Sequence, residues 1–553
     1  MFTPWLQSYP EDIPFTISEP DFTSLVDLFE NSFKQFSSNC AFINMDKKLS
    51  YQQLDLRSQR VATYLQQSLK LKQGDRVAIM MPNLLQYPII MVGILRAGLV
   101  VVNINPLYTA TELKHQLKDS GAKAIFILTN FASTLEQVVD DSAIEHVVLT
   151  EIADELTLIK RSVVNFAINH IKKMVPKFRS PGALSYREIL RLGNKGQYIR
   201  PVIKSSDIAF LQYTGGTTGE SKGSILTHAN MIASLQQADS FFGTTVKYPN
   251  NTVVTALPLY HAFALTVNGL YFLKKGGNNI LITNPRDINT FIKTLKKHPF
   301  TYFTGLNTLF NALLHNPAIK MVDFSKLKIT LAGGMATHES VATQWKQVTG
   351  CSIIEGYGLT ECSPLVSVNL PNSTTFNRSI GLPLPSTNIR LSRDDGTFVS
   401  QNNEPGEIEI KGPQVMAGYW NNQLETDKVL IDGWLKSGDI AQFDDQGFLH
   451  IVDRKKDMIL VSGFNVYPNE IEAVVAKFEA VLESAAIGIK DEQTGEKVKL
   501  FVVLKDHSAT IENIKQHCKQ YLTAYKRPKL IEIVTELPKN NVGKVLRRRL
   551  KEH

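Results

Sequence analysis

The chain has 553 residues, of which 43% are apolar, 20% charged and 9% aromatic. At roughly 100–200 residues per domain, this length predicts about three or four structural units, and the composition excludes a peptide-sized binding module, a collagen and a disordered tail. With 60 Lys and Arg against 52 Asp and Glu, the net charge of +8 favours anionic partners and leaves nucleic acid, nucleotide phosphates and anionic lipid open.

The cysteines and the N-terminus indicate the compartment. Four scattered cysteines favour a reducing environment over a disulfide framework or a zinc site. Residues 1–20 lack the basic start and the apolar run of a secretion signal, so we expect the protein to stay inside the cell. Residues 77–95 and 248–273 are free of charge, but prolines and polar residues interrupt both, and we interpret them as buried strands, turns and helices rather than membrane spans.

The predicted elements alternate between helices and β-branched strands through most of the chain, which is typical of a largely parallel α/β sheet. They are a helix beginning at Ser50 and strands over 77–81, 125–128, 253–257, 280–282 and 329–332. After residue 381, short segments separated by Gly, Pro and Asp indicate a small antiparallel sheet or barrel. The charged run 453–457 then precedes an α+β unit with helices from Asn469 and over 511–522 and strands over 485–489, 498–504 and 531–534.

Residues 157–179 carry six basic residues and no acidic one, and their apolar residues recur at roughly helical spacing. This pattern predicts a basic amphipathic helix, a kind of element that lies on anionic membranes. A surface helix packed on its own domain explains the pattern at least as well. The sequence leaves both interpretations open.

The densest local motif follows a predicted strand over 208–212 and reads Tyr-Thr-Gly-Gly-Thr-Thr-Gly-Glu-Ser-Lys-Gly from Tyr213 to Gly223. Glycines allow the backbone to turn tightly around an anion, threonine hydroxyls donate to phosphoryl oxygens, and Lys222 adds positive charge. The motif therefore predicts a phosphate-binding loop. It is not a Walker A loop, because Ser221 rather than Gly precedes the lysine.

Two further motifs lie C-terminal to this loop. The first, Leu-Ala-Gly-Gly-Met, supplies Gly333 and Gly334, and the second, Glu-Gly-Tyr-Gly-Leu-Thr-Glu, places Tyr357 between glycines and ends at Glu361. An aromatic ring flanked by glycines can stack on a base, and a carboxylate can hold a hard cation. Together with the phosphate-binding loop, these motifs describe the two ends of a nucleotide.

In this order the motifs resemble those of the adenylate-forming enzymes, the superfamily of acyl-CoA synthetases, luciferases and peptide-synthetase adenylation domains. The resemblance continues through the motifs at 432–439, 447–457, 462–468 and 538–548 and is strongest for bacterial long-chain fatty acid–CoA ligases. It implies an α/β fold: a large N-terminal domain over 1–453, made of two α/β subdomains and a small β-barrel, and a mobile α+β C-terminal domain over 454–553. The hinge would lie at 453–457, at Lys456.

The resemblance also implies a two-step reaction. A long-chain fatty carboxylate attacks the α-phosphate of ATP to give acyl-AMP and pyrophosphate, and the thiol of coenzyme A then displaces AMP, with Mg²⁺ as the metal. The alternative is a fatty acyl-AMP ligase that passes the acyl group to a carrier protein. A nucleic-acid partner is not expected, since no aromatic-basic stacking motif is present. The implied location is the cytoplasm, with peripheral contact to the inner membrane and a homodimer left open.

Site residues follow from the motif match alone. The implied catalytic residues are Lys544, Thr214, Glu361 and His261, with Thr214 and Glu361 at the metal. Lys544 would bridge the attacking carboxylate and the α-phosphate, while His261 would shape the pocket near the carboxylate. The residues implied to contact the nucleotide are Thr214, Gly215, Gly216, Thr217, Thr218, Gly219, Lys222, Gly333, Gly334, Glu355, Gly356, Tyr357, Gly358, Thr360, Asp439, Arg454 and Lys544. In the second step, Gly463 would line the path of the thiol.

Two positions depart from the family's pattern. Leu265 stands where some long-chain members have a gating Trp, four residues after the histidine, so chain-length control by that gate stays open. Glu220 and Ser221 replace a more apolar pair in the phosphate-binding loop. From the residues alone, Asp439 could also be a turn residue and Lys544 one of several basic residues near the C-terminus.

Overall fold

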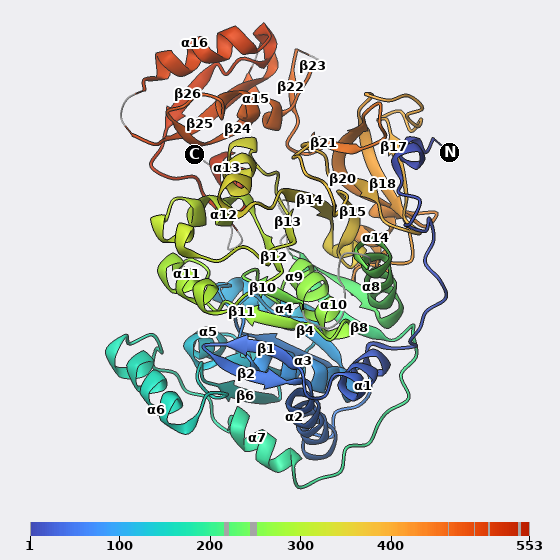
Figure 1. The fold of residues 1–553 in the computed structure, drawn as a ribbon, viewed down its shortest axis with the longest axis vertical. Helices are drawn as coiled ribbons and strands as arrows, with labels where there is room; N and C mark the ends of the chain where they lie inside the picture. The colour runs from blue at the N-terminus through green and yellow to red at the C-terminus, as the bar shows by residue number, and fades with distance from the viewer. Residues whose placement is uncertain are drawn as a thin grey trace.

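The computed structural model describes residues 2–214, 221–243, 251–462, 464–491, 493–506, 509–539 and 543–551. These residues form four β-sheets with helices packed around them (Figure 1). Figure 1 shows the C-terminal unit in red at the top left and an antiparallel sheet in orange at the top right, both above two α/β units. The expected α/β class, with a large N-terminal and a small C-terminal part, is confirmed.

The first α/β unit is a seven-stranded sheet in the order β7-β6-β5-β3-β4-β8-β9, parallel except for the β8–β9 pair. Its strands are β3 (Arg76–Met80), β4 (Val100–Asn103), β5 (Ala124–Leu128), β6 (His146–Thr150), β7 (Leu184–Ser185), β8 (Ile208–Thr214) and β9 (Lys222–Thr227). Its helices include α2 (Tyr51–Thr63), α3 (Gln86–Arg96), α4 (Ala110–Ser120), α5 (Ala132–Glu136) and α7 (Tyr186–Gly193). The predicted helix start at Ser50 is confirmed, because the Ser50 and Gln53 side chains form a capping box.

The second α/β unit is a nine-stranded sheet in the order β16-β15-β14-β13-β12-β10-β11-β1-β2, whose central strands are parallel. Its strands are β1 (Cys40–Asn44), β2 (Lys47–Ser50), β10 (Thr252–Thr255), β11 (Asn278–Leu281), β12 (Tyr302–Gly305), β13 (Ile329–Gly333), β14 (Ile353–Gly358), β15 (Leu365–Val368) and β16 (Leu382–Pro383). Its helices include α1 (Leu25–Gln35), α8 (His228–Phe242), α9 (Ala262–Ala264), η6 (Leu265–Leu270), α10 (Tyr271–Lys274), α11 (Ile288–Lys297), α12 (Asn307–Leu314) and α13 (Glu339–Thr349).

The charge-free stretches are buried strands and helices, as predicted. The first is β3 followed by α3, which is buried at every position, and the described part of the second runs from β10 to α10. Among the described residues, no helix combines the length and the apolar character needed to cross a bilayer. Polar residues in these stretches bond within the fold: the Asn83 side chain donates to the carbonyls of Thr255 and Leu257 at 3.0 and 2.9 Å.

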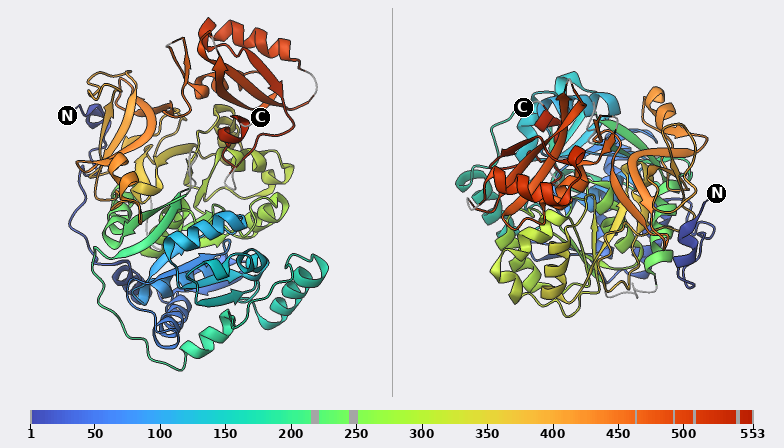
Figure 2. Two further views of the ribbon diagram at one scale, coloured as in Figure 1. Left: turned by 180° about the vertical axis from the view of Figure 1, so that it is seen from behind. Right: turned by 90° about the horizontal axis from the view of Figure 1, so that it is seen from above.

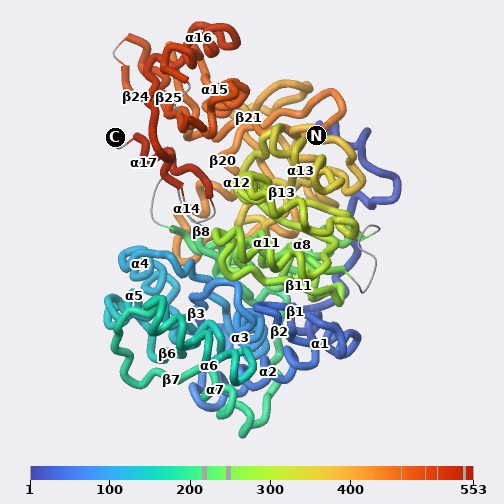
Figure 3. The backbone as a smooth tube through the Cα atoms, turned by 60° about the vertical axis from the view of Figure 1, so that its left-hand side comes forward, coloured from blue at the N-terminus to red at the C-terminus, as the bar shows by residue number. Residues whose placement is uncertain are grey.

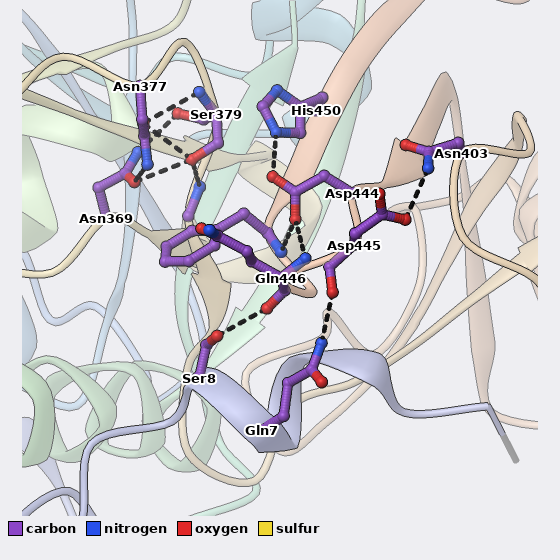
Figure 4. A network of polar contacts seen from close by, with 12 residues as sticks. Gln7, Ser8, Asn369, Asn377, Ser379, Asn403, Asp444, Asp445, Gln446 and His450 are labelled. Atoms are coloured by element: carbon purple, nitrogen blue, oxygen red, sulfur yellow. Dashed lines mark hydrogen bonds and ion pairs between the residues drawn. The ribbon is translucent and has the colours of Figure 1, made fainter.

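The third sheet is antiparallel and contains β17 (Asn388–Ser392), β18 (Gly406–Lys411), β19 (Leu430–Ile431), β20 (Trp434–Phe443) and β21 (Leu449–Arg454), with α14 (Gln423–Val429) beside it. The N-terminal segment fastens to its β20–β21 turn (Figure 4). Gln7 and Ser8, in the short helix η1 (Pro4–Ser8), donate to the carbonyls of Asp445 and Gln446 at 2.8 and 2.7 Å.

The turn that receives this segment requires a glycine. Gly447 has a φ of +81°, and a Cβ there would lie 2.3 Å from the Pro4 carbonyl oxygen. The ring of Trp5 stacks on Phe443 with centroids 5.3 Å apart, which adds apolar contact to the hydrogen bonds. The first residues of the chain thus brace the hairpin whose far end carries Asp439 and Arg454.

The C-terminal unit is an α+β sheet with its own core. Its elements are β22 (Ile459–Val461), β23 (Phe464–Val466), α15 (Pro468–Val475), β24 (Val481–Asp491), β25 (Gly495–Leu504), α16 (Ile511–Tyr521), β26 (Leu530–Ile533) and α17 (Arg547–Lys551). The helices and strands predicted here are confirmed within a few residues. The division at residue 453 stays a prediction.

One predicted element is shorter than expected. The amphipathic stretch 157–179 forms α6 (Leu158–Phe166) and one continuing π-helical turn, η5 (Ala167–Ile171), and the helix then ends. Lys173 adopts a left-handed φ of +49°, and Pro176 follows, so the helix cannot continue to Arg179. In Figure 1, α6 lies at the lower left edge of the molecule.

Candidate active site

The motifs at residues 331–335 and 355–361 lie on neighbouring parallel strands. In the β13–β14 pair, Gly333 is opposite Gly356, so both glycine motifs end at the same edge of the sheet. A Cβ on Gly333 would lie 3.1 Å from the Phe263 ring, and a Cβ on Gly358 would lie 1.7 Å from the Pro364 carbonyl oxygen. The absence of side chains lets the backbone approach closely and leaves the strand edge bare.

Glu355 is buried beneath this edge. Its Oε1 accepts a hydrogen bond of 2.7 Å from the Thr337 backbone N–H. Burial raises the pKa of Glu355 to about 7, although this hydrogen bond acts in the opposite direction. A carboxyl group poised near neutrality at this position can accept or donate a hydrogen bond.

Tyr357, Asp439 and Arg454 form one connected group. The Tyr357 hydroxyl donates to Asp439 Oδ2 at 2.7 Å, and Arg454 Nε lies 3.4 Å from Oδ1 of the same carboxylate. Asp439 and Arg454 are directly opposite each other in the β20–β21 pair, so the register of this hairpin sets their distance. The arrangement presents an oriented carboxylate next to the glycine motif, on a residue that is 6% exposed.

Lys544 comes from the C-terminal unit and joins this group. Burial and the Arg454 guanidinium lower the pKa of Lys544 to about 7, while the Asp439 carboxylate acts in the opposite sense. The preceding Gly543 has a φ of +83°, and a Cβ there would lie 2.7 Å from Oγ1 of Thr308 on α12. In Figures 2 and 3 the red C-terminal unit lies against the larger part of the molecule. The two parts therefore meet at the predicted site.

His261 also lies within electrostatic reach of Lys544. The residue precedes α9, and its Nδ1 accepts a long bond of 3.5 Å from the Phe263 N–H. The protein around its ring lowers the pKa of His261 to about 4, and the Lys544 ammonium adds to this effect. His261 is thus neutral at pH 7, which suits the predicted pocket-shaping role and not that of a cation. Leu265 begins η6 and is packed in the main core, 1% exposed.

Lys222, at the start of β9, is held in place by residues that the sequence did not suggest. It forms an ion pair with Glu425, and its Nζ lies 5.0 Å from the centre of the Tyr419 ring. Two lysines, Lys222 and Lys428, lower the pKa of Glu425 to about 2. A lysine held by a single, partly exposed carboxylate can exchange it for a phosphate.

Tyr419 also reaches Glu361, the predicted metal-binding carboxylate. Its hydroxyl donates to Glu361 Oε1 at 2.8 Å, and burial raises the pKa of Glu361. Tyr419 reaches this position because the segment around it continues the sheet beyond β9: Ser224 is bridged to Tyr419, and Ile225 N–H donates to the Gly418 carbonyl at 2.9 Å. The aromatic pair in Gly-Tyr-Trp at 418–420 was the only sequence signal for it.

Apart from the residues of the glycine edge described above, the predicted residues divide into three groups. The structure brings Lys544, His261, Asp439, Arg454 and Tyr357 together, and links Lys222 through Tyr419 to Glu361. Thr214 ends β8 opposite Lys222, and Thr360 begins the short helix η8 (Thr360–Cys362) that carries Glu361. Outside the described residues lie Gly215, Gly216, Thr217, Thr218, Gly219, Glu220 and Gly463.

Lys456 occupies the turn between the large and small parts. Burial and the Arg454 guanidinium lower its pKa. Its neighbour Lys455 is anchored to the third sheet, with Nζ 3.0 Å from Glu407 and 2.9 Å from Asp394. Movement of the C-terminal unit about this point would begin just beyond that anchor, and the hinge at Lys456 stays a prediction.

The chain matches two family models. That of the AMP-binding enzymes covers residues 29–420, and that of the AMP-binding enzyme C-terminal domain covers residues 470–544. The chain therefore belongs to the AMP-binding enzyme family.

Individual relatives and solved structures show which members of this family the chain is similar to. The long-chain-fatty-acid–CoA ligase of Yersinia pestis is 54% identical over 548 residues, which is 99% of this chain and 97% of the relative. Among solved structures, the anthranilate CoA ligase AuaEII in complex with anthranoyl-AMP has a TM-score of 0.84 at 25% identity, covering 96% of this chain and 97% of that one. ATP-bound MatB from Rhodopseudomonas palustris has a TM-score of 0.82 at 26% identity, covering 95% and 98%. The expected resemblance to bacterial long-chain ligases is confirmed.

Proposed function

We propose that this chain ligates long-chain fatty acids to coenzyme A, using ATP and passing through an acyl-AMP intermediate, with release of AMP and pyrophosphate. The full-length similarity to a long-chain-fatty-acid–CoA ligase supports the overall reaction. The position of Lys544 supports the first step most directly, because it brings a cation from the C-terminal unit beside Asp439, Arg454 and His261.

In the first step, each group of site residues contacts a different part of the substrates. Asp439 accepts from the ribose hydroxyls, and the glycine edge at 333–334 and 356–358 receives the adenine with Tyr357. Lys222 leaves Glu425 for the phosphates. Lys544 lies between the fatty carboxylate and the α-phosphate, where two anions raise its pKa above 7 and keep it protonated as charge accumulates in the transition state.

The metal in this proposal is Mg²⁺. The described residues contain no group of three or more His, Cys, Asp or Glu arranged to hold a metal. Mg²⁺ usually keeps several waters and binds through one or two carboxylates plus substrate phosphates. Glu361 and the Thr214 hydroxyl fit that donor set, since η8, which carries Glu361, contacts β8, which ends at Thr214, and the bound metal would offset phosphate charge.

The second step requires a different arrangement of the same site. Lys544 occupies the space beside His261 and Asp439, so the C-terminal unit would move away about Lys456 before the thiol of coenzyme A reaches the acyl-AMP. The alternative transfer to a carrier protein is not favoured by the relatives. We place the enzyme in the cytoplasm, and a homodimer stays a prediction.

The direct test incubates the purified protein with ATP, Mg²⁺, coenzyme A and a mixture of short to very long fatty acids, followed by mass spectrometry of the products. We expect acyl-CoA and AMP, with Lys544→Ala slowing acyl-AMP formation by about 10²–10³. Lys551→Ala, an exposed lysine in α17, is the matched control and should leave the rate unchanged. Acyl-AMP without thioester would favour the carrier-protein alternative, and ADP as the product would refute the proposal.

A further inference from the structure

The helix α6 and its continuation η5 present their apolar side chains to solvent. Neither element contains a buried residue. Ile159 is 81% exposed, Val163 63% and Phe166 59%, and Ile171 in η5 is 70% exposed. At spacings of four and three residues, the first three form one stripe along α6.

The opposite side of this helix faces the protein and is mixed, with the polar Asn165 and Asn169 beside the half-buried Val164 and Ile168. Asn165 Nδ2 donates to Glu151 Oε2 at 2.7 Å, its Oδ1 accepts from the Ala153 N–H at 3.3 Å, and Asn169 Nδ2 donates to Glu151 Oε1 at 3.4 Å. A surface helix ordinarily turns its apolar stripe to the core and its polar side to water. Here a second set of apolar residues is half-buried against the protein, but the stripe itself faces solvent, so packing on its own domain does not explain it.

Basic residues accompany this apolar stripe in the sequence. From Leu156 to Arg187 the chain has no acidic residue, and the basic residues of this segment are Lys160, Arg161, Lys172, Lys173, Lys177, Arg179 and Arg187. Lys160, Lys172, Lys173, Lys177 and Arg179 are exposed and, within the described residues, form no ion pair. Views from opposite sides show α6 in teal at the edge of the molecule, clear of the C-terminal unit (Figures 1 and 2).

From this geometry we propose that α6 and η5 form a docking surface for an anionic lipid bilayer. The stripe of Ile159, Val163, Phe166 and Ile171 enters the boundary between headgroups and acyl chains, and the lysines of the same segment contact the headgroups. Together they meet the two requirements of an interfacial helix: buried apolar area and attraction to anionic lipid.

Charge favours lipid over a second copy of this chain. The whole protein carries a net charge of +8, and the segment 156–187 that forms the docking surface contains basic residues and no acidic one, with Asp287 as a neighbouring carboxylate near Lys172. Two such surfaces facing each other would bring like charges together, whereas anionic headgroups supply the missing negative charge. Nucleic acid would neutralise the lysines but would leave the apolar stripe in water.

The proposal is independent of the ligase reaction, and its test needs no substrate. The full-length protein is sedimented with vesicles of phosphatidylcholine alone and with vesicles containing phosphatidylglycerol, at low and high salt. We expect binding to the anionic vesicles, weak binding to the neutral ones, and weakening with salt. Equal binding to both vesicle types, or none to either, would overturn the proposal.

Two variants separate the contributions. Lys172→Gln, Lys173→Gln and Lys177→Gln together should weaken binding to anionic vesicles about a hundredfold, at about fivefold for each charge. Ile159→Asn, Val163→Asn and Phe166→Asn together should weaken it at least tenfold. Full binding by both variants would contradict the assigned surface.

Matched controls carry the same changes elsewhere. Lys505, Lys515 and Lys519, exposed on the C-terminal unit, are replaced by Gln, and the exposed apolar residues Ile199, Val202 and Met321 are replaced by Asn. Both controls should bind as the wild type does, and a loss equal to that of the test variants would refute the assignment.

Hydrogen exchange and light scattering complete the test without relying on a variant. Anionic vesicles should protect the amides of residues 158–174 and leave α16 unchanged. If the apolar variant instead alters the oligomeric state in solution while vesicle binding persists, the surface joins two copies of the chain and the lipid proposal is wrong.

Discussion

Tyr419→Phe tests whether the hydroxyl of Tyr419 orients and ionises the predicted metal-binding carboxylate. The substitution removes one hydrogen bond of 2.8 Å to Glu361 Oε1 and keeps the ring beneath Lys222. A hydrogen bond to a charged group contributes about 1.5–3 kcal/mol, which corresponds to about a 10- to 100-fold change in an equilibrium constant. Burial already raises the pKa of Glu361, and loss of this donor raises it further.

The assay is the rate of acyl-AMP formation as Mg²⁺ is varied at several pH values. We expect Tyr419→Phe to need about 10- to 100-fold more Mg²⁺ for half-maximal rate, and the deficit to shrink as pH rises, because the metal requires the ionised carboxylate. In the metal-free protein the effect of the substitution should depend on pH in the opposite direction. The loss of thermal stability in Tyr419→Phe should grow as pH rises, because the hydrogen bond stabilises the ionised form of Glu361.

Tyr9→Phe is the matched control. The Tyr9 hydroxyl is also buried, but within the described residues it has no hydrogen-bond partner. Its removal should leave the Mg²⁺ requirement unchanged. If Tyr419→Phe and Tyr9→Phe give the same Mg²⁺ dependence, Tyr419 does not act through Glu361 and the reasoning fails.

Three further outcomes follow from the site. Because the pKa of Lys544 is about 7 in the ligand-free site, kcat/KM for acyl-AMP formation should fall above pH 7, and Lys544→Arg should remove that decline even if it lowers the rate. The pKa of Glu355 is about 7 in the folded protein, against an ordinary value of 4.5, so the folded state holds the proton more tightly than the unfolded state does. The free energy of unfolding in urea should therefore fall by up to about 3 kcal/mol between pH 4.5 and 7 and then level off, and Glu355→Gln should lack this slope. Gly358→Ala should prevent folding because its Cβ would meet the Pro364 carbonyl, whereas Gly350→Ala, with open space and only a positive φ, should cost about 1 kcal/mol in urea unfolding.

Much of the fold was predictable because its signals are local. The helix from Ser50 follows from a capping box within four residues, and the strands over 77–81 and 125–128 follow from continuous apolar runs. The end of the amphipathic helix was predicted too far along the chain: Pro176 is a helix-end signal in the sequence, but apolar spacing does not reveal the left-handed Lys173, before which the helix has already ended. The direction its apolar side faces was also beyond the sequence, since periodicity defines a face but not its neighbour.

Only those site residues that belong to recognisable sequence motifs could be predicted. Lys544 and Asp439 are 105 residues apart, from 439 to 544, and no local pattern would have placed them together. Tyr419 and Glu425 were missed for a related reason. Each contributes through contact with a motif residue, Glu361 or Lys222, and such contacts arise from the pairing of the 416–420 segment with β9.

The N-terminal segment is bound to the β20–β21 turn, so its contacts can form only late in the synthesis of the chain. Gln7 and Ser8 are made first, yet their partners at 445 and 446 emerge from the ribosome 438 residues later. At about 5–20 residues per second, this interval is roughly 20–90 s. During this interval Trp5 cannot stack on Phe443, and the N-terminal segment can fasten to the third sheet only after both α/β units are made.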